Sequence, residues 1–142
     1  MSRTMTHDEW RAFVLDAGRT GKLATVRADG RPHVAPVWFT LDGDDVVFTT
    51  GEHTAKGRSL QRDPRVSMCI DDERPPFSFV IIEGVAELSD DMDELLRWAT
   101  ALGARYMGEA EAEGFGQRNA VPGELLVRIR PTRVIARAAI AS

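Results

Sequence analysis

The sequence predicts a mainly β protein with short flanking helices, arranged as a small antiparallel barrel. Several short segments rich in β-branched residues are joined by tight turns, and two of these turns carry Asp-Gly, at Asp29-Gly30 and Asp42-Gly43. Glycine there supplies the positive φ that tight hairpins require. Helical segments do not alternate regularly with strands, and no G-x-G-x-x-G follows a strand. A parallel, doubly wound sheet is therefore disfavoured.

Seven strands are expected from the alternation of apolar and polar residues and from the turns between them. They cover residues 22–27, 32–40, 45–50, 65–71, 78–88, 124–130 and 133–139. Because Pro36 cannot donate to a neighbouring strand, its strand must lie at a sheet edge or bulge there. Gly84, inside a long strand, indicates a bulge, a sharp bend or the close approach of another backbone. Pro131 is expected to separate the last two strands.

Three helices are expected, over residues 7–16, 55–62 and 91–106. Thr6 and Glu9 have the spacing of a capping box, and the amphipathic helix behind them should cover an end of the barrel. Thr54 is the expected N-cap of the second helix, which Asp63 and the following proline end. The third has the strongest helical periodicity. Residues 108–123 are expected to form a helical turn at most, and otherwise loop.

Composition limits the function. The 142 residues suit one domain, spanning 1–142, and the net charge of −4 disfavours nucleic-acid binding, so any basic site must be local. The single Cys69 excludes an intrachain disulfide and a thiolate metal cluster, which fits a reducing cytoplasm. No run approaches the roughly 18 apolar residues that span a bilayer. The first residues do not resemble a secretory signal, so a cytoplasmic location is expected.

The helix after residue 54 is the main candidate for a binding site. It carries Lys56 and Arg58 in its first turns, where free backbone N–H groups and the helix dipole suit a phosphate or carboxylate. Hydroxyl groups that could add hydrogen bonds belong to Thr49, Thr50, Thr54 and Ser59. The alternative is a solvated helix face with ordinary surface cations.

The preceding strand offers a platform for a planar ring at Val37, Trp38 and Phe39. Core packing is the alternative, because aromatic residues in strands usually belong to the core. Pro36 favours the binding interpretation, since a strand that cannot pair fully leaves backbone groups free for a ligand. No catalytic residue and no metal site is predicted: His7, His33 and His53 are too scattered.

Several motifs together resemble a known superfamily. They are the hairpin LATVRADGRPHVAPVWF, the helix TAKGRSLQRDPRV, the strand IIEGVAEL, the pair Arg105-Tyr106 with Gly108, and the closing strand LLVRIRPTRV. In order and spacing they resemble the split β-barrel flavin and deazaflavin oxidoreductases, the superfamily of pyridoxamine 5′-phosphate oxidase. The detailed likeness is to the actinobacterial branch that uses the deazaflavin coenzyme F420, and it covers about residues 8–138.

This resemblance implies an FMN-binding-type split barrel that forms a homodimer, with two cofactor sites at the interface between subunits. Residues matching the family's ring and phosphate positions are Pro36, Val37, Trp38, Thr49, Thr50, Ala55, Lys56, Arg58 and Ser59. The partner subunit is expected to close the pocket with Phe77, Ser78 and Phe79, and less specifically with Arg118 and Asn119. The oxidase branch that makes pyridoxal phosphate has further basic C-terminal residues, and no matching motif is found here.

Three functions follow as hypotheses. In the first, the protein is an F420H2-dependent reductase that transfers a hydride to an unsaturated small-molecule acceptor. In the second, the same barrel binds FMN and acts as a flavin reductase or oxidase. In the third, it carries F420, haem or a lipid without turnover. F420 has an anionic polyglutamate tail, so the cations Lys56, Arg58 and Arg62 favour F420 over FMN as the cofactor.

Overall fold

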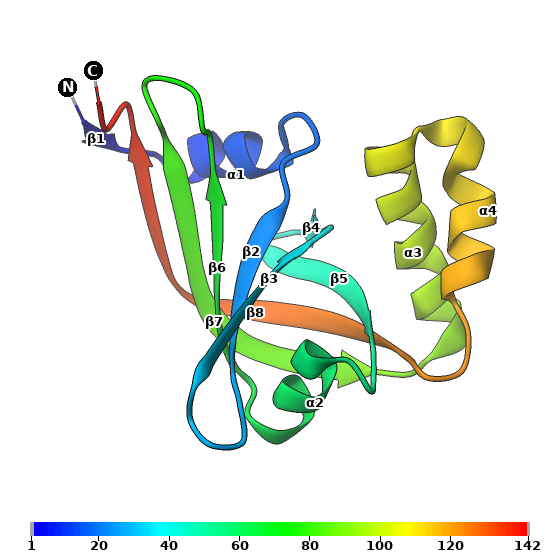
Figure 1. Ribbon diagram of the computed structural model, residues 1–142. Helices are drawn as coiled ribbons and strands as arrows, with labels where there is room; N and C mark the ends of the chain where they lie inside the picture. Colours follow the sequence, from blue (N-terminus) through cyan, green and yellow to red (C-terminus); the bar gives the residue numbers. More distant parts are fainter. Residues whose placement is uncertain (1, 142) are drawn as a thin grey trace.

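A curved antiparallel sheet dominates this computed structural model, which describes residues 2–141 (Figure 1). Within those residues the chain forms eight strands and four helices. The strands are β1 (Arg3–Thr4), β2 (Gly21–Val26), β3 (Pro32–Val37), β4 (Thr40–Asp42), β5 (Asp45–Gly51), β6 (Arg65–Asp71), β7 (Phe79–Ser89) and β8 (Glu124–Ala138). The helices are α1 (His7–Leu15), α2 (Ala55–Arg62), α3 (Met92–Met107) and α4 (Glu109–Asn119).

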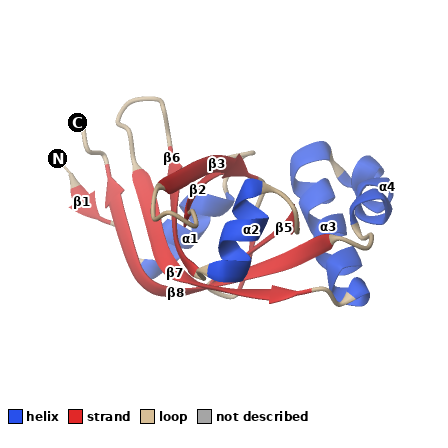
Figure 2. Cartoon of the chain, turned by 60° about the horizontal axis from the view of Figure 1, so that its bottom comes forward, coloured by secondary structure: helices blue, strands red, loops and turns tan. Residues whose placement is uncertain are grey.

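The strands are ordered β3-β2-β6-β7-β8-β5-β4, with β1 added against β8. The strands β7 and β8 bend as they cross the molecule, so each contributes to both halves of the sheet (Figure 2). The first half of β8 pairs with β5, its end pairs with β1, and β7 pairs with it throughout. This arrangement confirms the predicted split antiparallel barrel.

One predicted break in the sheet is wrong. The expected strands on either side of Pro131 form the continuous β8, because the register shifts there and the proline lies opposite Gly84 instead of in a regular ladder. A bulge accommodates a residue that cannot donate a hydrogen bond. A side chain at Gly84 would overlap the carbonyl oxygen of Arg130, so the expected close backbone approach is confirmed.

The expected strand at 32–40 is also corrected: β3 ends at Val37, and β4 begins at Thr40. As predicted, Pro36 lies on an edge strand, since β3 has only β2 as a neighbour. The short β1 was not expected, because two residues have no recognisable period. Gly30 and Gly43 have φ values of 86° and 60°, as the hairpin turns require.

The barrel core is apolar and lies between the sheet and α1. Trp10 and Val14 of α1 belong to one cluster with buried side chains from six strands and with Phe39, which lies between β3 and β4. The capping box is confirmed: the Thr6 hydroxyl accepts from the Glu9 N–H, and the Glu9 carboxylate accepts from the Thr6 N–H.

The α3–α4 hairpin stands beside the barrel (Figure 1). It packs through a smaller apolar cluster made of Val47, Leu95, Trp98 and Leu126. The expectation of a loop at 108–123 is wrong, because residues 109–119 form α4. Two glycines and weak amphipathicity make this helix hard to predict from sequence. Its stability comes from close packing on α3, where Gly116 lies against Thr100 and Gly103 against Phe115.

Candidate functional site

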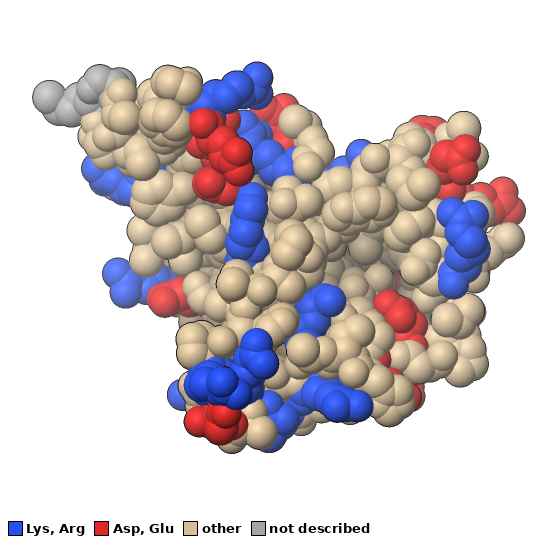
Figure 3. Space-filling model, in the orientation of Figure 1, with Lys and Arg blue, Asp and Glu red and all other residues tan. Residues whose placement is uncertain are grey.

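A cleft of about 290 Å³ opens between the barrel and the α3–α4 hairpin. Figure 3 shows the surface hollowed between these two parts. Five parts of the fold meet around it: the end of β3, the end of β5, the first turn of α2, the facing sides of α3 and α4, and the start of β8. Its lining residues are Pro36, Val37, Trp38, Thr49, Thr50, Gly51, Thr54, Lys56, Leu102, Phe115, Asn119 and Glu124.

One wall of the cleft is apolar and aromatic. Trp38 is 38% exposed, so it lies on this wall and not in the barrel core, whereas Val37 beside it is buried. The Trp38 ring stacks on Tyr106, with centroids 4.9 Å apart and planes at 11°. Its ring centroid is 5.4 Å from that of Phe115. Of the predicted platform Val37, Trp38 and Phe39, only Trp38 exposes its ring at the cleft. The prediction is wrong for Phe39, which is fully buried and packs in the barrel core.

The end of α3 holds this wall in place. Tyr106 accepts a hydrogen bond from the Phe39 N–H at 3.2 Å, and its hydroxyl lies 2.8 Å from the Arg19 carbonyl oxygen. Arg105 donates to the carbonyl oxygens of Phe39 and Val14. Both side chains therefore bind backbone of their own chain.

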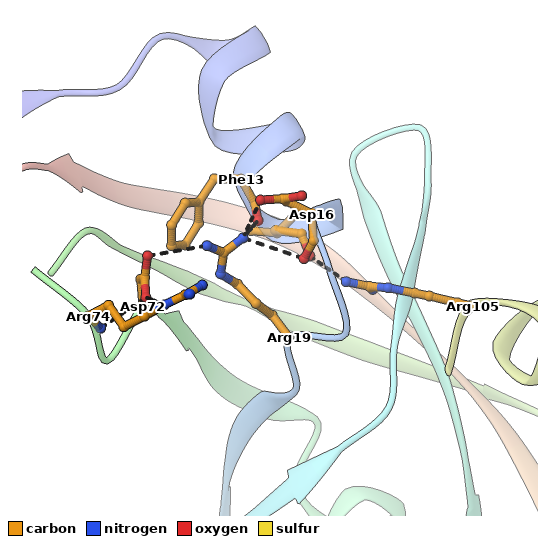
Figure 4. Close-up of polar contacts among 7 residues, drawn as sticks. Phe13, Asp16, Arg19, Asp72, Arg74 and Arg105 are labelled. Carbon is orange, nitrogen blue, oxygen red and sulfur yellow. Dashed lines mark hydrogen bonds and ion pairs between the residues drawn. The ribbon is translucent and has the colours of Figure 1, made fainter. Parts of the chain in front are cut away.

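Arg19 supports the same region from the other side (Figure 4). Its guanidinium donates to the Phe13 carbonyl oxygen at 3.0 Å and to the Asp16 carboxylate at 3.2 Å. It also reaches Asp72 at 3.4 Å and lies 4.2 Å from the centre of the Phe13 ring. These contacts join the end of α1 to the β6–β7 loop and position the backbone that Tyr106 binds.

The opposite end of the cleft is polar. Thr54 is the N-cap of α2, as predicted: its hydroxyl accepts from the Gly57 N–H at 3.1 Å and donates to the Gly51 carbonyl oxygen. Thr50 lies 3.0 Å from that hydroxyl. A side chain at Gly57 would overlap the Gly51 carbonyl oxygen, so glycine permits this tight turn. The turn brings the half-buried Lys56 to the cleft.

Glu124, the first residue of β8, shares this polar end with Lys56. It pairs across the sheet with Gly51. Burial raises the pKa of the Glu124 carboxyl above its ordinary value, and the charge of Lys56 opposes that rise. Within residues 2–141, neither side chain makes a hydrogen bond or ion pair. A cation and a carboxyl group therefore face the same space without a fixed partner.

The other predicted residues of α2 lie elsewhere. Ala55, Arg58 and Ser59 line a second depression on another side of the helix, so Lys56 and Arg58 do not share one cavity. That depression is lined by Arg27, Ala28, Asp29, Arg31, Ala55, Arg58, Ser59 and Arg62. Figure 3 shows basic side chains gathered over the β2–β3 hairpin and α2.

Phe77, Ser78 and Phe79 lie at the β6–β7 loop, at the opposite end of the molecule from α2 (Figure 1). They line a third depression with Cys69, Asp71, Asp72, Glu73 and Ile140. The Ser78 hydroxyl accepts from the Ala139 N–H at 3.0 Å. The fold does not bring this segment to the cleft of the same chain.

Sequence reasoning missed Gly51, Leu102, Phe115 and Glu124, and it assigned Asn119 to a partner subunit although Asn119 lines the cleft of its own chain. Phe115 and Asn119 were not predicted to line the cleft of their own chain because residues 108–123 were expected to form mostly loop. An acid at the first position of a strand is ordinary on a surface, so Glu124 carried no signal in the sequence.

No helix within residues 2–141 combines the length and apolar character needed to cross a membrane. No group of three or more His, Cys, Asp or Glu side chains in that part of the chain is arranged to hold a metal ion.

The bent long strands, the edge strand β3 and the cleft at the ends of β3 and β5 define a split β-barrel protein. The chain belongs to the pyridoxamine 5′-phosphate oxidase family, whose sequence profile matches residues 6–138. The resemblance found in the sequence is therefore confirmed for the family and the fold.

Solved structures agree with this assignment. A conserved hypothetical protein from Mycobacterium tuberculosis is 30% identical, with a TM-score of 0.80 over 92% of this chain and 82% of that chain. An F420 reductase is 27% identical, with a TM-score of 0.67 over 87% of this chain and 94% of that chain. The haem storage protein from Vibrio cholerae shares the fold at 22% identity, with a TM-score of 0.73 over 92% and 94% of the two chains.

Proposed function

We propose that this protein is an F420H2-dependent reductase that acts on an unsaturated small-molecule acceptor in the cytoplasm. The observation that carries the proposal is the division of one cleft into an aromatic wall around Trp38 and a polar end around Lys56. A bound deazaflavin would supply the hydride, while the protein provides orientation and a site shielded from water. Similarity to an F420 reductase at 27% identity supports this choice.

The residues present fit the parts of such a cofactor. Residues 36–38 would lie along the ring, and Thr49 and Thr50 beside the ribityl chain. Lys56 would pair with the phosphate, since no acid holds its ammonium group within residues 2–141. The N–H groups of Ala55 and Lys56 are the first two of α2 and have no acceptor within the helix.

The second depression supports F420 over FMN. Four arginines line it with a single acid, Asp29, and it shares α2 with the cleft. A polyanionic tail that leaves the cleft past Lys56 would meet Arg58 and Arg62 on the neighbouring side of the helix. FMN ends at its phosphate and has no group that would use these cations.

Titration of the purified protein with F420 and with FMN, followed by cofactor fluorescence, tests the proposal. Lys56→Ala is expected to weaken binding of both by about tenfold to a hundredfold, as loss of a charge-assisted contact does. Arg58→Ala should weaken F420 and leave FMN unchanged, so each variant controls for the other. Binding of FMN without binding of F420 would reverse the cofactor assignment.

Turnover separates the reductase from a carrier. Reduced F420 should be oxidised when the protein meets an acceptor among quinones, tetrapyrroles, nitro-aromatics or enones. Tight binding of F420 with no oxidation across that panel would instead support a carrier. Tight binding of haem in place of F420 would support a haem-binding role for this barrel.

A homodimer forms part of the proposal, because Phe77, Ser78 and Phe79 reach the cleft only from a second copy. Cross-strand pairing places Val34 and Val85 on one outer sheet face, where they are 67% and 41% exposed. Light scattering should report a dimer that Val34→Asp converts to a monomer. The matched change Val121→Asp, outside the sheet, should leave the dimer intact. A monomeric unmodified protein would refute this part.

A further inference from the structure

The polar end of the cleft contains two groups of opposite charge that no other residue neutralises. Glu124 reaches it from the start of β8 and Lys56 from the first turn of α2. Both are half-buried, and neither makes a hydrogen bond or ion pair within residues 2–141. An anion that binds Lys56 therefore shares the cleft with the negative charge of Glu124, and the two charges repel.

Other charged groups near Glu124 point elsewhere. On the turn between β5 and α2, the Glu52 carboxylate lies 3.2 Å from the His53 ring, outside the cleft lining. On α4, Arg118 folds back along its own helix towards Gly114, while the uncharged Asn119 faces the cleft. The part of β5 that pairs with Glu124 contributes only threonines and Gly51. Lys56 is thus the one charged group among the described residues that shares the cleft with Glu124.

We propose that Glu124 is a specificity-determining residue that takes up a proton when an anionic group binds Lys56. In the empty cleft the ammonium group stabilises the carboxylate. When an anion engages Lys56, that stabilisation is lost and like charges repel, so the neutral acid is favoured and can donate a hydrogen bond to the anion. This inference rests on the proposed function in taking Lys56 as the partner of the anion.

The burial of Glu124 supports proton uptake. Burial already raises the pKa of Glu124 in the empty cleft, so a further rise on binding moves the group towards neutral pH. Affinity for an anion is expected to fall as the pH rises towards the pKa of Glu124 in the complex. One linked proton lowers the affinity by at most about tenfold per pH unit. The cleft would thereby disfavour multiply charged anions at high pH.

Calorimetric titration in buffers of different ionisation enthalpy counts the protons directly. The probes are F420, FMN and inorganic pyrophosphate, measured over a pH series from mildly acidic to mildly alkaline. The unmodified protein should take up a fraction of a proton, at most one, over the part of the series where Glu124 changes its protonation on binding. Glu124→Gln should lose that fraction and bind more tightly at the high-pH end.

The controls separate this effect from others. FMN and pyrophosphate also exchange protons themselves, but equally with the unmodified protein and with Glu124→Gln. The difference in proton uptake between these two proteins is therefore due to Glu124. Glu52→Gln, which changes an acid outside the cleft, should behave like the unmodified protein. Proton uptake by the unmodified protein needs no variant, so it can be measured even if Glu124→Gln folds poorly.

The outcomes distinguish the two proposals. Equal proton uptake and equal pH dependence with and without Glu124, or no anion bound at all, would overturn the role of Glu124. If pyrophosphate binds with linked proton uptake while F420 and FMN do not bind, the role of Glu124 stands and the proposed function fails.

Discussion

Tyr106 stacks on Trp38 with ring centroids 4.9 Å apart while its hydroxyl lies within 3.2 Å of the Phe39 nitrogen. One side chain of α3 thus supports the aromatic wall of the cleft and anchors the backbone next to it. Residues 67 positions apart meet in this hydrogen bond, which joins the α3–α4 hairpin to the edge of the sheet. The shape of the cleft therefore depends on a contact outside its lining.

Removing the hydroxyl of Tyr106 tests this support. Tyr106→Phe keeps the stack on Trp38 but leaves the N–H of the buried Phe39 without its acceptor. We expect a loss of about 1–3 kcal/mol in the free energy of unfolding, measured in urea. Cofactor affinity should fall as well, because the wall at residues 36–38 loses its anchor. A variant as stable as the unmodified protein, with unchanged affinity, would contradict this account.

The packing of α4 on α3 offers a second test. A side chain at Gly116 would overlap the Thr100 hydroxyl and come 3.1 Å from the Thr100 Cα. Gly116→Ala should therefore displace α4 and destabilise the protein by about 1–3 kcal/mol, the usual effect of overpacking. Because Phe115 and Asn119 move with α4, cofactor affinity should fall too.

Adding Thr100→Ala removes the overlapping hydroxyl and should restore part of the stability lost by Gly116→Ala. Double-mutant analysis of urea unfolding measures this coupling. Independent, additive effects of the two changes would argue against the close helix contact.

The bulge in the long strands gives a third prediction. A Cβ at Gly84 would lie 2.8 Å from the Ile129 side chain in addition to overlapping the Arg130 carbonyl oxygen. Gly84→Ala should lower the midpoint of thermal unfolding markedly, since backbone cannot move aside as a flexible side chain can. Gly18→Ala is the control, because its nearest neighbour would be Tyr106 at 3.9 Å. Equal midpoints for the two variants would refute the prediction.

Acid sensitivity follows from the capping box of α1. Hydrogen bonds from Arg3, and then from the Thr6 N–H, lower the pKa of Glu9 to about 2. A lowered pKa stabilises the folded state above the unfolded value near 4.3, and this contribution is lost as the pH falls towards about 2. The stability difference between the unmodified protein and Glu9→Gln should therefore shrink on acidification.

Urea unfolding of both proteins across this pH range measures the effect, which should be modest because the pair is exposed to solvent. Thr6→Ala, which removes the hydroxyl half of the capping box, should stay destabilised throughout. A constant gap between Glu9→Gln and the unmodified protein would contradict the assignment.

Features that depend on neighbours in sequence were predictable. The caps at Thr6 and Thr54, and the turns at Gly30 and Gly43, follow from hydrogen bonds or φ values spanning a few residues. Gly84 indicated a bulge, a sharp bend or a close backbone approach, but the sequence did not identify the segment opposite it. The family motifs predict that Lys56 and residues 36–38 bind a cofactor, and this stays a prediction.

Features that depend on distant partners were not predictable. Helix α4 has too little amphipathic character to be predicted from sequence, and it is stable because its Gly116 fits against Thr100 of α3. Pro131 interrupts strands in general, but here Gly84 opposite it allows β8 to continue. In each case a residue far along the chain reverses the local preference.

The amino-acid sequence alone determined the barrel class, the caps and turns, and the presence of cations at the start of α2. Only the tertiary structure decided which side chains share a space: it separates Lys56 from Arg58 and unites Lys56 with Glu124. The physical reason is that a helix turns by about a third of a circle per residue. Neighbours along α2 therefore face different surfaces, while β8 returns from far along the chain to complete the cleft.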